Sequence, residues 1–476
     1  MANLTTDHAN SVTALDDQVD RLVGRVRDFR QGVIVGTSDE LAEEIQALNG
    51  RMDAEERAMY LAAARTSRRP VPCLIFDFDK RLYLRGRHFL EREMDFDNEM
   101  AFVRDSDGSY FTSDGEMAIR APNKLRYDHD PYSGEALGVL VEGGSTNILQ
   151  NSEVFAEDSA WNRENVSVVA SSIKPPLPSG TSYEISSTST SAFKALRQVS
   201  TSAGPGWTAS IFVKKVSGTR DTVRMSYSGS DGSGPAAEFN IVTGAIGDTN
   251  PDLIAHAPQR LKNGWWRLSI TFGNLYSGGQ VKFCWIDPVG SVTSDMVVAA
   301  FGAQLEDKDH ATSYIRSLGS PATRNSDNPE YMLQTSLNSS AGSVYMEFRS
   351  NNLPSNSFFY ALMAGGGNRE ISAYINSAGR VLASPISSAN DIISAGEWIK
   401  FGYSFDVEGA TCAVDGDSIG TEVSKSISPR EFDRIRIGRQ IGSGDGAFGM
   451  LHGHVRRFYY YPKRLTAAEL EDITNG

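Results

Sequence analysis

Hydrophobic residues in most of this chain alternate with polar ones, which is the pattern of a half-buried β-strand. The alternation is clear at residues 207–216, 265–272, 342–349 and 398–405. Turns rich in Gly and Asn separate the apolar segments, and no helix-period segment of ten residues occurs between about 150 and 325. The pattern predicts a mainly β protein whose strands form sandwiches of the jelly-roll or concanavalin-like kind.

The first 70 residues follow a different period. Seven apolar residues are spaced alternately three and four apart: Val12, Leu15, Val19, Leu22, Val26, Phe29 and Val33. A period of 3.5 is typical of a left-handed coiled coil, so this stripe predicts the oligomerisation surface of a helical stem. A helix packed on its own domain is the alternative. The residue types in the stripe do not distinguish a coiled coil of two helices from one of three.

These changes of pattern divide the chain into four expected parts. They are a helical coiled-coil stem at 1–70, a small β connector at 71–150, a jelly-roll domain at 151–328 and a second β-sandwich at 329–476. Near the end, Thr466 and Glu469 form a capping-box pattern, which predicts a short helix after the last strand.

The acidic composition of the chain makes some classes of binding partner unfavourable. The chain has 46 Lys and Arg against 59 Asp and Glu, a formal net charge of −13, which disfavours nucleic acid and anionic membranes as partners. No apolar run reaches the ~18 residues of a membrane span. The N-terminus lacks the basic and apolar regions of a signal peptide, so we expect synthesis in a cytoplasm without export by that route.

Signatures of common enzymes are missing, which favours a protein without catalytic activity. There is no GxSxG, HExxH, Walker A or Rossmann glycine motif. A glycosidase needs only two convergent carboxylates, and 59 acidic residues always offer some pair, so a polysaccharide depolymerase stays as an alternative.

No cofactor or metal is predicted. Asp105, Asp107 and Asp114 lack the spacing of a calcium loop and favour a hairpin turn, so structural Ca²⁺ has no support. His452 and His454 lie two apart on a predicted strand, so we expect both on one face. A surface or hydrogen-bonded pair is favoured over a metal site.

Three ordered blocks resemble a module of tailed-bacteriophage fibre and virion-surface proteins. They are FVRDSDGSYF at 102–111, PNKLRYDHDP at 122–131 and GVLVEGGSTNIL at 138–149. The chain departs from that pattern at 103–106, where VRDS replaces Thr-Arg-Ala-Ser, and at Ser145, where the module has Arg. The resemblance implies a virion-surface location, a homotrimer and attachment to other virion proteins through the stem. It supplies no catalytic residues.

Two further resemblances concern the sandwiches. The blocks ASIFVK at 209–214, NGWWRL at 263–268 and FGAQLE at 301–306 are similar to a carbohydrate-binding-module-type jelly roll. The blocks CAVDG at 412–416 and GHVRRFYYYPKRLTAAEL at 453–470 resemble a concanavalin-like, laminin-G-type sandwich. Such sandwiches often serve as docking surfaces for glycans or proteins.

The glycan-binding candidates are Trp265, Trp266 and Arg456. Adjacent residues of a strand face opposite sides, so one of the two indoles should point outward and could stack on a sugar ring. A tryptophan covering the sandwich edge or a trimer contact is the alternative. Arg456 belongs to a basic group that could contact an anionic glycan, with salt bridges on a solvated face as the alternative.

Together these observations predict a bacteriophage fibre of the tail, collar or head. The expected partners are a second and third copy of the chain, other virion proteins and a host surface polysaccharide. Weak sites repeated on three arms would act together through avidity. A purely structural virion protein, whose sandwiches bind other virion proteins, is the first alternative, and the depolymerase is the second.

Overall fold

The computed structural model confirms a mainly β fold built from sandwiches. It describes residues 70, 72–85, 92–93, 100–157, 159–188, 194–199, 206–228, 234–250, 252–272, 280–285, 296–337, 340–353, 357–364, 368–383, 386–388, 392–422, 432–439 and 449–475. The stripe from Val12 to Val33 lies outside the described residues, so the coiled-coil stem stays a prediction. Among the described residues no helix has the length and hydrophobicity needed to cross a membrane.

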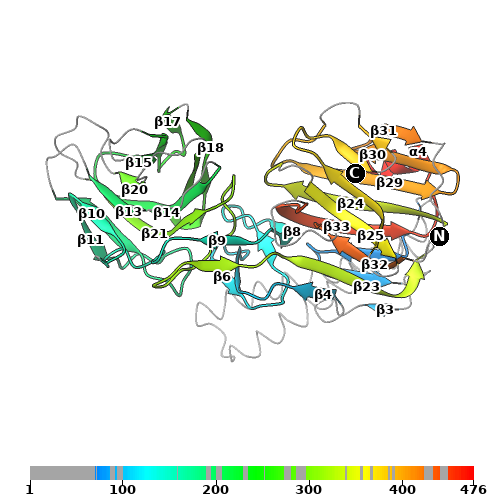
Figure 1. Ribbon diagram of the computed structural model, residues 1–476, viewed down its shortest axis with the longest axis horizontal. Helices are drawn as coiled ribbons and strands as arrows, with labels where there is room; N and C mark the ends of the chain where they lie inside the picture. Colours follow the sequence, from blue (N-terminus) through cyan, green and yellow to red (C-terminus); the bar gives the residue numbers. More distant parts are fainter. Residues whose placement is uncertain are drawn as a thin grey trace, which may run out of the picture. The chain divides into compact units, whose positions relative to one another are not determined.

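The first sandwich, green in Figure 1, consists of two antiparallel sheets in the described residues. One sheet has the order β10 (Asn162–Glu164), β13 (Ala195–Val199), β20 (Gln280–Trp285), β15 (Thr222–Ser228), β16 (Ala236–Asn240) and β17 (Ile246–Thr249). The other has the order β11 (Val166–Ala170), β12 (Tyr183–Ser187), β21 (Val297–Glu306), β14 (Thr208–Ser217), β19 (Trp266–Phe272) and β18 (Leu253–Arg260).

Strand β14 shows how this sandwich buries both faces of its second sheet. Ile211 and Val213 belong to the core between the two sheets. Phe212 points to the other side and joins a smaller apolar cluster with Met117 and Trp265. The outer face of the sheet is therefore covered at Phe212, which is why β14 has a nearly continuous run of buried residues.

The second sandwich contains the larger hydrophobic core. Its first sheet runs β3 (Arg92–Glu93), β2 (Leu82–Arg85), β1 (Leu74–Asp77), β33 (Gly453–Tyr461), β24 (Ala341–Ser350), β29 (Trp398–Asp406), β30 (Gly409–Val414) and β31 (Asp417–Glu422), with β8 (Ala136–Val141) and β7 (Tyr127–His129) branching from β33. Its second sheet runs β28 (Ile386–Ser387), β27 (Val381–Ala383), β26 (Asn368–Ile375), β25 (Ser357–Ala364), β32 (Phe432–Ile437), β23 (Asn328–Leu337) and β4 (Met100–Val103).

The expected β connector at 71–150 is wrong as a separate unit, because most of its strands complete the second sandwich. Phe76 of β1 is the register partner of Phe458 in β33, and Phe102 of β4 is the partner of Pro329 in β23. Figure 1 shows these blue strands among the yellow and red ones. The apolar alternation of the segment revealed strands, but not which distant strands they pair with.

The first sandwich is therefore an insertion in the second. The chain enters it after β9 (Ser145–Asn147) and leaves it at β22 (Ala322–Arg324), and these two strands pair antiparallel, with Thr146 opposite Thr323. All these strands belong to one unit, Pro72–Gly476.

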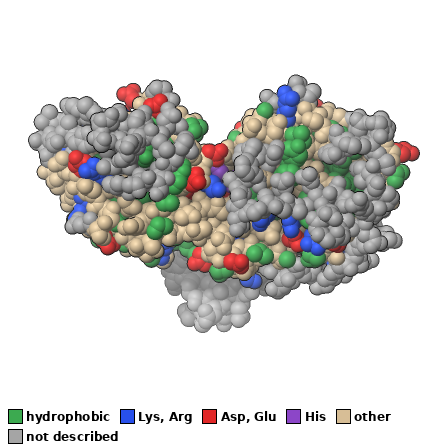
Figure 2. Space-filling view, in the orientation of Figure 1, with side chains coloured by type: hydrophobic (Ala, Val, Ile, Leu, Met, Phe, Trp, Pro, Cys, Tyr) green, Lys and Arg blue, Asp and Glu red, His purple; other side chains and the backbone are tan. Residues whose placement is uncertain are grey.

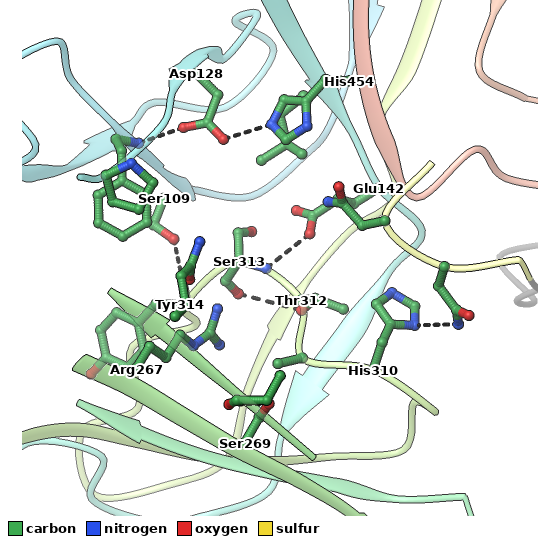
Figure 3. Close-up of a pocket in the computed structure, with 18 of the residues that line it drawn as sticks. Ser109, Asp128, Glu142, Arg267, Ser269, His310, Thr312, Ser313, Tyr314 and His454 are labelled. Carbon is green, nitrogen blue, oxygen red and sulfur yellow. Dashed lines mark hydrogen bonds and ion pairs between the residues drawn. The ribbon is translucent and has the colours of Figure 1, made fainter. Parts of the chain in front are cut away.

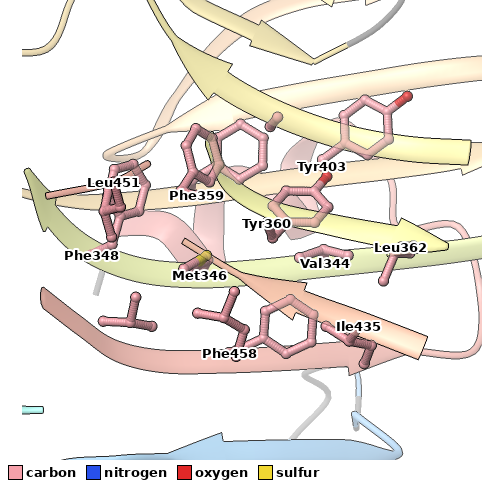
Figure 4. Packing of buried hydrophobic residues seen from close by; sticks show 14 of the residues in the cluster. Val344, Met346, Phe348, Phe359, Tyr360, Leu362, Tyr403, Ile435, Leu451 and Phe458 are labelled. Carbon is pink, nitrogen blue, oxygen red and sulfur yellow. The ribbon is translucent and has the colours of Figure 1, made fainter. Parts of the chain in front are cut away.

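The core of the second sandwich is filled by aromatic and branched aliphatic side chains from both sheets. Figure 4 shows Phe348, Phe359 and Phe458 between the strands, with Val344 and Ile435 beside them. The rings of Phe348 and Phe359 stack at 4.4 Å between centroids. This packing fixes β24 and β33, whose ends reach the site described below.

The predicted C-terminal helix is present as α4 (Ala467–Asn475), directly after β33. The backbone N–H of Thr466 donates to the Glu469 carboxylate at 2.8 Å, and the N–H of Glu469 donates to the Thr466 hydroxyl at 3.2 Å. These reciprocal bonds form the capping box that the sequence predicted. Leu470 of this helix is buried against β29 and β30, so the helix covers one end of the sheet.

Candidate functional site

A buried network of ion pairs lies where the chain passes between the two sandwiches. Arg104 and Arg126 are fully buried, and both bind the carboxylate of Asp327. Arg126 also lies 2.9 Å from Glu142, which is 3.6 Å from Arg324. Burying charges is costly unless they are paired, and here the pairs are supplemented by backbone acceptors, such as the carbonyl of Ala121 for Arg104 at 2.9 Å.

The electrostatics of this network are consistent with fully charged groups. Burial acts to raise the pKa of Glu142, but Arg324 and Arg126 outweigh it and hold that pKa well below its usual range. Likewise Asp327 and Glu142 raise the pKa of Arg126 despite its burial. Glu142 is thus an anion that acts as a fixed structural partner and has no spare capacity as a general acid near neutral pH.

This network accounts for the sequence blocks that resemble the phage module. Arg104, Arg126 and Glu142 come from the three blocks at 102–111, 122–131 and 138–149. Asn147, from the last block, donates from its side-chain amide to the carbonyls of Ala303 and Ile315. The blocks therefore have a structural role. They supply the buried ion-pair network, called the joint below, that connects the inserted sandwich to the second one.

A pocket of about 430 Å³ lies beside this network. This volume is within the range of small-molecule sites, roughly 300–1,000 Å³. Its walls come from the 109–142 segment, from β18 and β19, from the loop at 309–314 and from the second sandwich at 349–352 and 454. Figure 3 shows the labelled side chains converging on this space, and Figure 2 shows acidic, basic and histidine side chains close together at a hollow in the surface.

One wall is the outer face of β19. Arg267, Ser269 and Thr271 are two residues apart on this strand, so their side chains share a face. The hydroxyls of Thr271 and Thr208 lie 2.7 Å apart, and Arg267 donates to the hydroxyl of Ser210 at 3.0 Å. This wall is rich in short polar side chains, which leaves room above the strand.

The opposite wall carries a histidine held in a chain of hydrogen bonds. Nε2 of His454 lies 2.8 Å from Asp128, whose other oxygen accepts the backbone N–H of Phe111. Because an ionised carboxylate only accepts, His454 carries its proton on Nε2, and its Nδ1 is free to accept from Arg349 at 3.4 Å. Burial lowers the pKa of His454, which is consistent with a neutral ring.

Two further imidazoles, His310 and His452, lie in contact with each other, and His310 lines the pocket. His310 is beside Asp309, with Nδ1 at 2.8 Å from the carboxylate, and Asn352 donates to the same oxygen of Asp309 at 2.8 Å. The ring of His310 meets the ring of His452 edge to face, with centroids 4.8 Å apart. The hydrogen bond from His310 is the main cause that lowers the pKa of Asp309, to about 2.

His452 and His454 are thus not a pair on one strand face. His452 precedes β33 in a left-handed backbone conformation, with φ of 49°, and contacts His310. His454 is inside the strand and contacts Asp128. The left-handed residue breaks the alternation on which the prediction rested. Both rings are buried, so a surface pair is wrong, while a hydrogen-bonded role is correct for His454.

His452 should make stability depend on pH. Burial, together with His310, lowers its pKa from 6.5 to about 3; Lys308 and Arg324 act in the same direction, and Glu142 opposes them. A lowered folded-state pKa means that the unfolded chain binds more protons, so stability falls as pH decreases below about 6.5. The expected loss from this group between pH 8 and pH 5 is about 2 kcal/mol.

His452→Asn should remove this contribution while tolerating the left-handed backbone. Urea unfolding of both proteins at pH 8 and pH 5 measures it, and the variant should lose about 2 kcal/mol less on acidification. An equal loss in both proteins would show that His452 is protonated in the folded state. At pH 8 the ring is neutral in both the folded and the unfolded chain, so a difference in unfolding free energy between the two proteins at that pH measures any loss of packing caused by the substitution.

One of the two adjacent tryptophans was expected to form an exposed sugar platform, but both are buried, so an exposed platform is wrong. Trp266 begins β19 and points into the core between the sheets, where its ring lies against Gly244. Trp265 points the other way, as adjacency predicted, but Met117 and Leu177 cover it and its indole N–H donates to the carbonyl of Lys174 at 3.1 Å. The cover is supplied by segments distant in sequence, which strand alternation does not reveal.

Arg456 is half-buried and already paired. It lies 3.1 Å from Glu347 and 2.8 Å from Glu135, and its guanidinium is 3.8 Å from the centre of the Trp398 ring. It does not line the pocket of Figure 3. These contacts correspond to the salt bridges that were the alternative prediction for Arg456. Binding of a glycan by Arg456 stays a prediction.

The described residues contain no group of three or more His, Cys, Asp or Glu side chains placed to hold a metal ion. Asp105 accepts from the side chain of Asn123 at 3.2 Å. Asp114 lies in the turn between β5 (Gly108–Phe111) and β6 (Met117–Arg120), a hairpin as predicted. No pattern in the sequence indicated Arg267, Arg349 or His310 as pocket residues, because they meet only in the folded chain.

No family model matches this chain, and no curated protein matches it. Matches to solved structures cover about a third of it. A pentraxin from Limulus polyphemus is 15% identical over 30% of this chain and 73% of its own, with a TM-score of 0.26. The carbohydrate-binding module of a Ruminococcus gnavus sialidase, bound to α2,3-sialyllactose, is 16% identical over 30% of this chain and 84% of its own, with a TM-score of 0.25.

A third similar structure is domain 4 of an extracellular arabinanase from Geobacillus stearothermophilus, in complex with arabinotriose. It is 13% identical over 35% of this chain and 84% of its own, with a TM-score of 0.25.

Proposed function

We propose that this protein binds a glycan in the pocket between β19 and the Asp128–His454 pair, without transforming it. The observation that carries the proposal is the lining of this pocket. Carboxylate, amide, guanidinium, imidazole and hydroxyl groups surround a space of about 430 Å³, with the rings of Tyr110, Phe111 and Tyr314 among them. Sugars are held by this combination, in which polar groups take the hydroxyls and rings contact the C–H faces.

Binding without catalysis is supported by how the polar groups are used. The hydroxyl of Ser109 donates to the carbonyl of Tyr314 at 2.8 Å, and that of Ser313 accepts from Arg126 at 2.7 Å. Neither serine is therefore activated by His454, whose Nε2 is engaged by Asp128. Glu142 is held as an anion by two arginines, which removes it as the acid of a glycosidase.

The biological setting that we propose is the surface of a bacteriophage, as a trimeric fibre of the tail, collar or head. This part rests on the resemblance of residues 102–149 to the phage module and on the heptad stripe. A single polar pocket gives weak affinity, and repetition on three chains and several fibres raises the effective concentration of sites. The bound polysaccharide would then belong to the surface of a host cell.

Filling the pocket tests the proposal. Ser269 lines it from β19, and Ser269→Trp should occupy the space above Arg267 without opening the core. We expect binding of labelled protein to an array of bacterial surface polysaccharides to fall at least about tenfold, because an indole excludes a sugar of similar size. Thr249→Trp is the matched control, because Thr249 is exposed on β17 and does not line the pocket.

Equal binding by the Ser269→Trp variant would place recognition elsewhere on the sandwiches. A wild-type protein that binds no polysaccharide would refute glycan recognition and favour a structural virion protein. Release of reducing ends from a bound polysaccharide would instead indicate the depolymerase.

A further inference from the structure

Arg267 carries a buried guanidinium that has no anionic partner in contact among the residues that the structure describes. It is 8% exposed and lies 5.3 Å over the ring of Phe212. Its Nη2 donates to the hydroxyl of Ser210 at 3.0 Å, and its Nε has no hydrogen-bond partner among the described residues. Among the residues that the structure describes, no carboxylate lies within 4.0 Å of it.

The other buried arginines nearby each have a carboxylate partner. Arg104 and Arg126 share Asp327, and Arg324 is paired with Glu142. For Arg267, burial lowers the pKa, while Glu306 and Glu142 act against this from beyond contact distance. Glu306 is already occupied, because it accepts from Ser145, Thr312 and Gln304. A buried charge without a partner is unfavourable, so Arg267 is suited to bind an anionic group from outside the protein.

The acidic groups of the same pocket cannot serve as that partner, because each is used within the protein. Asp128 binds His454, and Asp309 binds His310 and Asn352. Asp130 accepts two backbone N–H groups and a hydroxyl from its own turn. These carboxylates are therefore engaged by other residues, and none of them is paired with Arg267 among the described residues.

A second guanidinium on the pocket walls is also incompletely used. Nε of Arg349 is a buried donor with no hydrogen-bond partner among the described residues. Figure 3 shows the guanidinium of Arg267 extending towards the segment of Thr312 and Ser313, into the space between the walls. The pocket thus has two guanidinium groups, Arg267 and Arg349, each with an unused Nε donor, and they point to a ligand that carries an anion.

We propose that the pocket binds an acidic sugar, a uronic or nonulosonic residue of a glycan, with its carboxylate on Arg267. This inference rests on the proposed glycan-binding function and specifies its ligand. The planar guanidinium can hold a carboxylate through two parallel hydrogen bonds, which lysine cannot reproduce. Ser269 and Thr271, on the same face of β19, lie where they can bond the hydroxyls of the ring.

The test compares matched sugars on the whole protein. Titrations of wild type with glucuronic acid, N-acetylneuraminic acid, the methyl ester of glucuronic acid and glucose are followed by ligand-observed NMR. At least one free acid should bind about tenfold or more tightly than the ester and glucose. Arg267→Met should abolish this preference. Arg267→Lys, which keeps the charge and is the second variant in case the first does not fold, should reduce it strongly.

Arg260→Met is the control. Arg260 is exposed on the neighbouring strand β18, does not line the pocket and lies 4.3 Å over the ring of Tyr132. This variant should retain the preference for the acid. Loss of the preference for the acid in both Arg260→Met and Arg267→Met would overturn the inference, because the overall charge of the protein would then explain the preference.

The other outcomes separate this inference from the proposed function. Glucose bound as tightly as the acids, with binding still blocked by Ser269→Trp, would overturn the acidic-sugar inference and leave glycan binding standing. Glucose 6-sulfate bound as tightly as the carboxylates would also overturn it, in favour of a sulfated ligand. No binding of any sugar or polysaccharide would refute both.

Discussion

Replacing Asp327 by alanine is expected to lower the free energy of unfolding by about 3–5 kcal/mol, which is the usual cost of removing one partner from a buried ion pair. Both oxygens of Asp327 are used: one accepts from Arg104 at 3.1 Å, and the other accepts from Arg126 and from the backbone N–H of Glu142 at 2.9 Å. Removal would leave two fully buried guanidinium groups with too few acceptors. Urea unfolding at neutral pH measures the change.

A surface ion pair supplies the control for Asp327. Glu116 pairs with Lys174, and both side chains are largely exposed, at 41% and 62%. Glu116→Ala should therefore cost less than about 1 kcal/mol. A similarly small loss in Asp327→Ala would mean that water enters the joint and solvates the arginines, and the network would then not be what fastens the inserted sandwich.

Phe76→Ala is expected to cost about 3–5 kcal/mol, as large-to-small changes in well-packed aromatic cores do. Phe76 is fully buried on β1, and its ring lies 5.1 Å from that of Tyr331 and 5.8 Å from that of Phe458. Both partners belong to the C-terminal part of the chain, although Phe76 precedes the first sandwich. The destabilisation should therefore appear in the second sandwich.

Hydrogen exchange followed by mass spectrometry locates this effect. Amides of β24 and β33 should exchange faster in Phe76→Ala, while those of β14 and β19 should change little. Val103→Ala, at a position on β4 that is 47% exposed, should leave both sets unchanged. Faster exchange confined to residues 72–85 would contradict the architecture, because it would make β1 and β2 an accessory to a sandwich that is complete without them.

The joint and the pocket are neighbours, and this has a consequence for function. Glu142 lines the pocket and also takes part in the network through Arg126. Its backbone N–H is fixed by Asp327, and its carboxylate accepts the N–H of Ser313 at 2.9 Å. The rigid network therefore sets the positions of pocket residues from both sandwiches, which reduces the ordering cost of binding a ligand there.

Much of the local structure followed from the sequence. The alternation at 207–216 and 398–405 corresponds to β14 and β29, and the capping box at Thr466 starts α4. These features depend on neighbours within a few residues, where the side-chain period of a strand and the hydrogen bonds of a helix end are encoded directly. The mainly β sandwich fold could be predicted for the same reason.

The predictions that went wrong depended on distant contacts. Trp265 faces out of its sheet as expected, yet Met117 and Leu177 bury it. His452 departs from the strand period because its backbone is left-handed, and the segment at 74–103 pairs with strands more than 220 residues later. A pattern along one strand specifies which side chains share a face, but it does not specify what covers that face.

The sequence by itself thus determined the class of fold, the position of most strands and the terminal helix, because these rest on short-range periodicity. Only the tertiary structure decided that the first sandwich is an insertion, that the phage-like blocks form a buried ionic joint, and that Arg267, Arg349 and His454 line one pocket. Each of these depends on which strand edges pair and which charges are desolvated together. That selection is made by the whole core, since burial and ion pairing are properties of residues brought together from far apart in the chain.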